Sequence, residues 1–413
     1  MSFDLLVKGG VLPNGVQADI AIAKGTIVSV EPGITAQTAK VIDATGKLVS
    51  PPLIDCHFHM DATLSYGTPR VNASGTLLEG IALWGELKTL QTREDIVARA
   101  LRYCRQAISN GVLAIRSHVD VTDPSFRTVE ALLEVRDILK GKIDLQLVAF
   151  PQDGWLRAPG AEARVIRALD AGVDIVGGIP HFERTMADGT AAVHAACRIA
   201  AERGLMVDLH CDESDDPMSR HIETLAEATI AFGLQGRVTG SHLTSMHSMD
   251  NYYVSKLIPL IAEARVAAIA NPLINITLQG RADSYPKRRG MTRVPELLAG
   301  GVTVAYGQDC AMDPWYPLGS GDMLDVAHMG LHIALMTGTD QMYRSFQMVT
   351  EAPAQIMGLN FGLHKGARGS LIVLDCATPI EALRLRPARL SVVSDGVEVA
   401  RTEPARTAVA SFD

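Results

Sequence analysis

The chain has 413 residues, of which 47% are hydrophobic and 20% are charged, and its formal net charge at pH 7 is −8. This length and composition are enough to bury a large core, which excludes an intrinsically disordered chain and a small disulfide-stapled protein. The acidic balance, without long runs of Lys and Arg, argues against nucleic acid as a partner.

The two ends of the chain share a pattern. Residues 1–48 and 366–413 alternate apolar and polar residues and contain Gly and Asn-Gly turns, which is typical of β-hairpins. Because the termini of a domain often lie close together, we expect these two segments to form one small β-sandwich, with the rest of the chain inserted between them.

The middle of the chain, residues 49–365, contains eight short apolar runs typical of buried strands. They lie at 49–59, 112–118, 144–150, 173–178, 205–210, 237–242, 266–271 and 302–307. Stretches with the apolar spacing of helices lie between them, at 93–111, 128–141, 190–204 and 254–264. Gly111, Gly204 and Gly301 stand where a helix would end before the next strand.

Eight successive strand–helix units predict an α/β fold, a (β/α)₈ TIM-like barrel that forms the catalytic domain. A doubly wound open sheet is the alternative, but it should carry a GxGxxG turn after its first strand, and the sequence contains none there.

Several histidines fall at predicted strand ends, where barrel enzymes place their reactive groups. Side chains two positions apart on a strand share a face, so His57 and His59 can converge on one ion. With His210 and Asp309 they make a set of nitrogen and oxygen donors suited to one divalent metal ion, Zn²⁺ or Fe²⁺. A single strand-end histidine is more often a core residue, but the pair followed by two further donors favours a metal site.

An acid and a further histidine follow in the same region. Glu213 lies three residues after His210, on the loop that leaves the fifth strand. A bound metal ion lowers the pKa of a water molecule to about 7, and Glu213 is predicted to carry the proton that this water releases when it attacks. The other acids of that loop, Asp212, Asp215 and Asp216, fit a solvated surface better. His242, at the end of the sixth strand, is predicted to orient the water or stabilise charge, with a supporting position behind the ligands as the alternative.

Longer stretches carry a family resemblance. They read PPLIDCHFHMD, SGTLLEG, SHVDV, AFPQDGW, GGIPHFE, DLHCDESDD, SHLTSMHS, ANPLINITLQGRADSYPKRRGMTRV and DPWYPLG. Because these stretches are spread over essentially its whole length, the chain resembles the bacterial cytosine deaminases of the amidohydrolase superfamily. The resemblance implies a hydrolase with one metal ion that cleaves a cyclic amidine C–N bond, converting cytosine or 5-methylcytosine to uracil or thymine plus ammonia.

The resemblance also implies roles for individual residues. Those that match the family's metal ligands are His57, His59, His210 and Asp309. Those that match its catalytic residues are Glu213, His242 and again Asp309, which can accept a proton on its second oxygen. Gln152 matches a glutamine that binds the amide edge of the pyrimidine, and Leu77 and Trp315 match pocket-lining positions, although both residue types are also common in cores.

Two observations bear on related enzyme classes. Two-metal relatives use a modified Lys at the end of the fourth strand, and residues 143–181 contain no Lys, so we expect a single ion. Another class of deaminases carries HxE followed by PCxxC. This chain has an HxE at His181–Glu183 but no PCxxC, so we interpret that segment as a loop shaping the pocket.

The chain departs from the family directly after the eighth strand. Cytosine deaminases read GHDD there, whereas this chain reads GQDC, so Cys310 replaces an acid that lies beside the ring. A thiol accepts a methyl group more readily than a carboxylate does. Burying a methyl contributes about 0.8 kcal/mol, and pockets distinguish one methylene by roughly 10 to 200-fold. We therefore favour 5-methylcytosine as substrate, with a cytosine deaminase that tolerates Cys310 as the alternative.

Other functions stay open. Aminohydrolases of other rings, such as creatinine or an s-triazine, share this ligand pattern. A dihydroorotase-like hydrolase should carry the missing Lys, and a noncatalytic metal-binding barrel has no need for Glu213 and Gln152. The basic stretch YPKRRG, residues 285–290, is interpreted as a loop over the site or a subunit contact.

The remaining expectations concern location and partners. No apolar run reaches the roughly 18–20 residues of a membrane helix, and the first residues lack a secretory signal pattern, so we expect a cytoplasmic chain without a membrane partner. The expected partner is a small pyrimidine, and the resemblance implies a homo-oligomer such as a hexamer. The six cysteines lack CxxC spacing, and most are expected to be buried free thiols.

Overall fold

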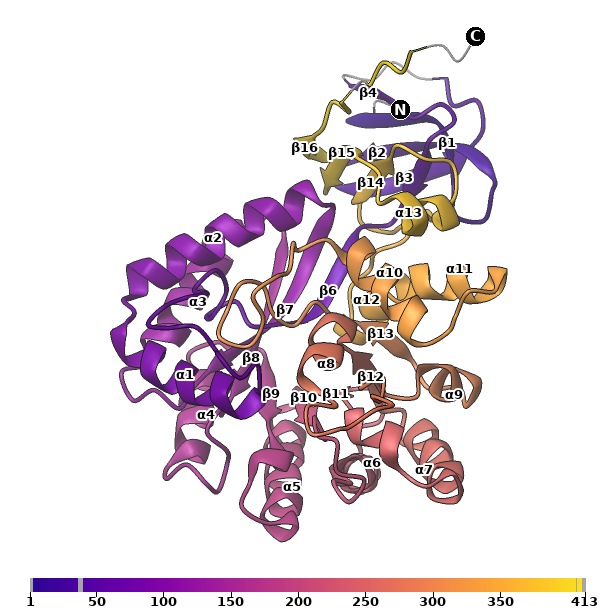
Figure 1. Ribbon diagram of the computed structural model, residues 1–413. Coiled ribbons are helices and arrows are strands. Elements are labelled where there is room, and N and C mark those ends of the chain that lie inside the picture. The colour runs from indigo at the N-terminus through magenta and orange to yellow at the C-terminus, as the bar shows by residue number, and fades with distance from the viewer. Residues whose placement is uncertain (1–2, 36–39, 406, 411–413) are drawn as a thin grey trace.

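The computed structural model describes residues 3–35, 40–405 and 407–410, and shows a barrel with a small β domain attached (Figure 1). Positions 1–2, 36–39, 406 and 411–413 of the predicted terminal segments lie outside the described residues. Among the helices of the described part, none combines the length and the apolar character needed to cross a membrane. All six cysteines are free and buried, as expected.

Eight parallel strands form the barrel and pair in the order in which they occur in the chain. They are β6 (Leu53–Phe58), β7 (Val112–Asp120), β8 (Asp144–Phe150), β9 (Ile175–Gly178), β10 (Met206–Cys211), β11 (Val238–His242), β12 (Ala267–Ala270) and β13 (Val304–Tyr306). The predicted α/β barrel is therefore confirmed. Its strands are almost completely buried, which explains their continuous apolar runs.

The first and last strands of the barrel meet just beyond β13. Phe58 and Asp309 form an isolated parallel bridge. The Asp309 N–H donates to the His57 carbonyl at 2.8 Å, and the His59 N–H donates to the Asp309 carbonyl at 2.9 Å. The residues that close this seam are thus three of the four predicted metal ligands.

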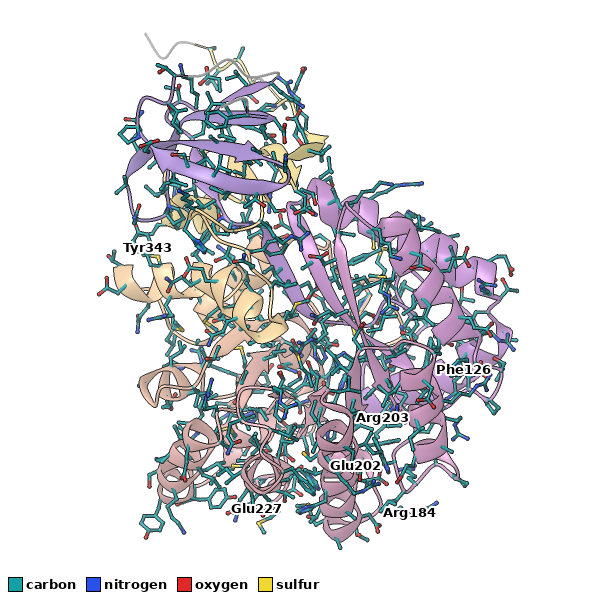
Figure 2. The ribbon with its side chains drawn as sticks, turned by 180° about the vertical axis from the view of Figure 1, so that it is seen from behind. Phe126, Arg184, Glu202, Arg203, Glu227 and Tyr343 are labelled. Carbon is teal, nitrogen blue, oxygen red and sulfur yellow. The ribbon has the colours of Figure 1, made fainter. Side chains whose placement is uncertain are left out.

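Helices surround the strands (Figure 1). The barrel helices are α1 (Leu77–Leu90), α2 (Arg93–Ser109), α3 (Arg127–Leu139), α4 (Ala161–Asp170), α5 (Met186–Arg203), α6 (His221–Ala231), α7 (Asn251–Glu263), α8 (Pro272–Leu278), α9 (Val294–Ala299), α10 (Met323–Ile333), α11 (Thr339–Gln347) and α12 (Glu351–Met357), with short 3₁₀ turns η1 (Pro180–Phe182) and η2 (Thr244–Ser248). The four predicted helices correspond to α2, α3, α5 and α7. Figure 2 shows the molecule from behind, with Glu202 and Arg203 labelled at the end of α5.

Local sequence explains where these helices begin and end. The Thr92 hydroxyl accepts from the Asp95 N–H, and the Asp95 carboxylate accepts from the Thr92 N–H, so a capping box begins α2. Gly204 ends α5 with a φ of 70°, a left-handed conformation that costs glycine little. Helix α1, which follows the first barrel strand, was not predicted from its apolar spacing.

The two ends of the chain form one mixed sheet, in the order β16–β15–β14–β5–β1–β2–β3, with β4 paired to β1. Its members are β1 (Leu5–Val11), β2 (Gln17–Ala23), β3 (Thr26–Glu31), β4 (Val41–Asp43), β5 (Leu48–Ser50), β14 (Leu371–Leu374), β15 (Arg389–Ser394) and β16 (Val397–Arg401), with α13 (Pro379–Leu385) between β14 and β15. The predicted joining of both termini is confirmed.

The strand predicted at 49–59 is divided between the two domains. Val49 in β5 pairs with Val373 of the terminal sheet, whereas β6 begins at Leu53 in the barrel. Pro51 and Pro52 stand between them. Because proline has no N–H to donate to a ladder, a Pro-Pro pair separates two strands that the apolar pattern joins.

Candidate metal centre and substrate cavity

The four predicted metal ligands converge at the carboxyl ends of the barrel strands. The Nε2 atoms of His59 and His210 lie 2.8 Å apart. Asp309 Oδ1 lies 3.4 Å from Nε2 of His57 and 3.4 Å from Nε2 of His59. All four side chains are buried. Residues from β6, β10 and the segment after β13 thus surround one point.

The backbone turns sharply where the polar side chains leave the strands. Asp212, His242 and Asp309 have φ values of 55°, 71° and 67°, in the left-handed region. A non-glycine residue in this region costs about 1–3 kcal/mol, and it persists only where the surrounding structure imposes it. Such positions cluster at functional sites, which agrees with the place of these three residues after β10, at the end of β11 and after β13.

The ring nitrogens indicate that the cluster fits a metal ion. Both ring nitrogens of His57 and Nδ1 of His210 are buried and have no hydrogen-bond partner among the described residues. Leaving a buried polar atom unpaired costs about 1–3 kcal/mol, so such atoms call for a ligand. Two sets of four have donor atoms within 4.8 Å of one another: His57, His59, His118 and His210, and His57, His210, His242 and Asp309.

Burial also leaves the imidazoles in the form that binds metal. It lowers the pKa of His57 and His210 well below the usual 6.5, and that of His59 to about 3. Neutral imidazole has a free nitrogen lone pair for a metal, whereas imidazolium does not. Imidazole and carboxylate donors suit both zinc and iron, so this cluster can hold a divalent metal ion.

His118 is a member of the cluster that the sequence analysis missed. Its ring centroid lies 4.3 Å from that of His57 and 4.4 Å from that of His210. Asp208 lies behind it, with Oδ1 3.6 Å from His118 Nε2, and accepts a 2.9 Å hydrogen bond from fully buried Arg116. His118 ends the strand predicted at 112–118, so the signal that identified the other histidines was present.

Glu213 and His242 lie next to each other beside these ligands. Glu213 Oε1 is 3.4 Å from His242 Nδ1, and both side chains are buried. Burial, reinforced by the negative charge of Asp309, raises the pKa of Glu213 well above its usual 4.5. His242 is held by Asn275, whose Nδ2 lies 3.0 Å from its Nδ1. A carboxyl group that can retain a proton therefore faces the site.

The predicted substrate residues share one cavity with three of the predicted metal ligands, His59, His210 and Asp309. Its walls are formed by His59, Leu77, Gln152, Ile179, His210, Glu213, Ile274, Leu278, Asp309, Cys310 and Trp315. Every predicted substrate-binding residue is among them. The sequence analysis missed Ile179, Ile274 and Leu278, because an apolar residue in a loop or helix carries no sign of the cavity it faces.

Cys310 lies directly beside the metal cluster. It is 3% exposed, and its Sγ lies 3.7 Å from Asp309 Oδ1. Burial raises the pKa of this thiol well above 9, so it stays protonated and uncharged. Asp313 anchors the following loop by accepting the N–H groups of Trp315 and Tyr316 at 2.9 and 3.0 Å.

The basic loop at 285–290 is tied to the loop that carries Glu213. Arg288 Nη1 donates to the Asp215 carbonyl at 3.1 Å and to the Ser248 hydroxyl at 2.8 Å. Asp215 also accepts the Gly280 N–H at 2.7 Å. Tyr285, at the tip, is 90% exposed. The arginine is therefore engaged within the chain rather than presented as an open cationic patch.

Known structures share this architecture. The 5-methylcytosine deaminase from Klebsiella pneumoniae, solved with 5-fluorocytosine, is 40% identical, and the alignment covers 98% of this chain and 99% of that one with a TM-score of 0.95. The N-isopropylammelide isopropylaminohydrolase from Burkholderia multivorans is 29% identical, covering 96% of this chain and 98% of that one with a TM-score of 0.84.

Sequence comparison agrees. A pterin deaminase from Rhizobium rhizogenes is 31% identical over 348 residues, which cover 83% of this chain and 78% of the relative. The family model described as "Amidohydrolase family" matches residues 40–400, which include every ligand and cavity residue described above. The chain belongs to the amidohydrolase family and is a hydrolase.

Proposed function

We propose that this protein is a metal-dependent deaminase of a free pyrimidine base and that it prefers 5-methylcytosine to cytosine. The observation that carries the proposal is the place of Cys310, a buried neutral thiol in the cavity wall beside Asp309. The similarity to a 5-methylcytosine deaminase over almost the whole chain supports the same reaction.

Gln152 is assigned to substrate orientation. It is 4% exposed and is the only amide side chain among the residues described around the cavity. A carboxamide both donates and accepts hydrogen bonds, so it matches a ring edge on which a carbonyl oxygen and a ring nitrogen lie side by side. Binding this edge at Gln152 would direct the amine-bearing carbon toward the ligands.

Glu213 is assigned to proton transfer. When a divalent ion is bound by His57, His59, His210 and Asp309, it supplies Lewis acidity that lowers the pKa of water to about 7. The Glu213 carboxylate takes a proton from the attacking water and delivers it to the ring nitrogen beside the attacked carbon. Its raised pKa suits this role, because the carboxyl group can hold the proton between the two transfers.

A second transfer completes the reaction. The water oxygen is now bonded to the ring carbon, and the exocyclic nitrogen needs a proton to leave. Asp309 Oδ2, which lies 3.8 Å from His242 Nε2, is assigned to accept the second water proton and pass it to this nitrogen. The C–N bond then breaks, and ammonia and the carbonyl form of the base are released. His242 holds the geometry of Glu213 and Asp309.

The test of substrate preference exchanges the residue at position 310. Wild-type protein should show a higher kcat/KM for 5-methylcytosine than for cytosine. Cys310→Asp should move this ratio toward cytosine by roughly 10 to 200-fold, because a carboxylate disfavours the methyl group. Cys310→Ser is the matched control, since it keeps the size and neutrality of the side chain. An unchanged ratio in Cys310→Asp would contradict the proposed preference.

A second candidate is an aminohydrolase of another ring. The similarity to the N-isopropylammelide isopropylaminohydrolase described above supports this candidate. Ammonia or amine release from a panel of creatinine, s-triazines, pterin and pyrimidines separates the two candidates. Release from a triazine or pterin but from neither pyrimidine would replace the first proposal by the second.

Three further expectations remain predictions. Elemental analysis of the purified protein should find about one divalent ion per chain and identify it as zinc or iron. Sedimentation analysis should find a homo-oligomer, such as a hexamer. The preparation should carry no nucleic acid, as expected for a chain of net charge −8.

A further inference from the structure

Helix α1 forms part of the cavity wall and contains two glycines. Leu77, at its first position, lines the cavity. Gly80 is buried and Gly85 is half-buried. Glycine is the least favourable residue in a helix interior apart from proline, so its presence needs a local reason. Neither glycine has a left-handed φ, so backbone conformation does not supply that reason.

At Gly80 the reason is the indole of Trp315. A Cβ atom added to Gly80 would lie 2.3 Å from Trp315 Cδ1, 2.7 Å from Nε1 and 2.9 Å from Cγ. These distances are far below van der Waals contact. At Gly85 an added Cβ has no neighbour within 4 Å among the described residues. The indole therefore occupies the place that a side chain at position 80 would take.

Helix α1 is also anchored to the barrel, through Trp84 and Lys88. Trp84 Nε1 donates to Asp120 Oδ2 at 2.8 Å, which ties α1 to the end of β7. Lys88 Nζ lies 3.3 Å from the same oxygen and donates to Asp153 Oδ2 at 2.6 Å. Two residues of α1 are thus anchored to the barrel, so the helix resists moving away from Trp315.

On its other side Trp315 faces the reaction site. It lines the cavity together with Cys310, and its ring centroid lies 5.8 Å from that of His59. Its backbone N–H is fixed by Asp313. With the helix anchored and the loop fixed, a methyl group at position 80 can be accommodated chiefly by rotation of the indole, and the space beyond the indole is the cavity.

We propose that Gly80 is a specificity-determining residue: by lacking a side chain it lets Trp315 lie back against α1, which leaves room for a ring that carries a 5-substituent. The inference rests on the proposed pyrimidine deaminase function. It makes the substrate range depend on a residue that does not itself line the cavity.

The experiment compares Gly80→Ala with Gly85→Ala, which makes the same change in the same helix without a neighbour. We expect Gly80→Ala to lower kcat/KM for 5-methylcytosine relative to cytosine by about 10-fold or more, since one methylene changes such ratios by roughly 10 to 200-fold. Gly85→Ala should leave the ratio unchanged. The double variant Gly80→Ala/Trp315→Phe should return the ratio to that of Trp315→Phe alone, because the smaller ring removes the clash.

Each outcome has a defined meaning. If wild-type protein deaminates neither pyrimidine, the proposed function fails. If it deaminates both and Gly80→Ala changes both substrates equally, or behaves like Gly85→Ala, the specificity role of Gly80 is overturned. If Gly80→Ala alone does not fold, the double variant decides: recovery of folded enzyme supports the contact with Trp315, and failure to recover it overturns the inference.

Discussion

The cavity has two walls of different origin. One is polar and consists of His59, His210, Glu213 and Asp309, which follow or end the barrel strands. The other is apolar and includes Leu77, Ile274, Leu278 and Trp315, which lie on α1, on α8 and in the loop before α10. Strand ends are fixed by the hydrogen-bonded barrel, whereas helices and loops can be exchanged around it. We therefore expect changes to the polar wall to affect the chemical step most, and changes to the apolar wall to affect mainly which ring is accepted.

The polar wall also has a charged support beneath it. Arg116 and Asp208 are fully buried and paired, and Asp208 also accepts the Ser241 hydroxyl at 2.9 Å. The apolar wall is held mainly by packing among apolar and aromatic side chains, and polar contacts of Trp84 and Lys88 tie its helix α1 to the barrel. The substitutions below test whether catalysis, stability and substrate selectivity respond differently to changes in the polar wall, its charged support and the apolar wall.

The largest expected effect is on the polar wall. Glu213→Gln removes the carboxyl proton carrier while keeping its shape, so kcat should fall by about 10² to 10⁴-fold, the usual contribution of general acid–base catalysis. Metal content and thermal unfolding should match wild type. Activity close to wild type would show that another group moves the proton.

The support beneath the polar wall is tested by Asp208→Asn. Removing one partner of a buried ion pair leaves the Arg116 charge uncompensated, and the free energy of unfolding should fall by about 3–5 kcal/mol. The control is Asp170→Asn. Asp170 pairs with Arg203 at 2.7 Å on the surface and should change stability by only about 0–1 kcal/mol (Figure 2 labels Arg203). Equal losses in denaturant titrations would refute a supporting role for the buried pair.

Metal removal tests why the buried nitrogens have no partners. An ion that binds only the folded protein stabilises it by about 2.7 kcal/mol when its free concentration is 100 times its Kd. Stripping the ion with a chelator should therefore lower the unfolding temperature, and re-adding zinc or iron should restore it. Asp309→Asn, which weakens the ligand set, should respond less. A chelator-insensitive unfolding temperature in wild type would contradict the metal assignment.

The smallest expected effect is on the apolar wall. Ile274→Val deletes one methylene from a buried side chain and should cost about 0.5–1.5 kcal/mol in stability. Because Ile274 lines the cavity, the ratio of kcat/KM between substrates should change while metal content does not. Ile261→Val, in the buried face of α7, is the control: it should cost similar stability and leave the ratio unchanged.

The same division explains what could be predicted from the sequence. Each barrel strand was visible as an apolar run, and a polar residue at the end of such a run is conspicuous, so His57, His59, His210 and Asp309 were found together. His118 carried the same signal and was overlooked. Glu213 and Gln152 lie just beyond strands. The role of Glu213 was predicted from its place after His210, whereas the role of Gln152 came from the family resemblance alone.

The apolar wall was less visible, for physical reasons. Helix α1 carries exposed apolar residues, Leu78 and Leu90, in addition to the buried face that includes Ile81, Trp84 and Leu87, so its apolar spacing does not show a single face. Ile179 and Leu278 read as ordinary core residues. The steric role of Gly80 depends on a residue 235 positions later in the chain (315 − 80), and local sequence carries no record of such a contact.

The seam of the barrel has a consequence for how the protein moves. Asp309 offers its carboxylate to the ligand cluster and its backbone to the first strand, through hydrogen bonds with His57 and His59. Transient local opening of this strand pair would therefore separate the ligands at the same moment. Amide hydrogen exchange at the seam and the release of the ion should then both follow this local opening. A metal ion bound at the centre would in turn stabilise the pairing of the first and last strands of the barrel.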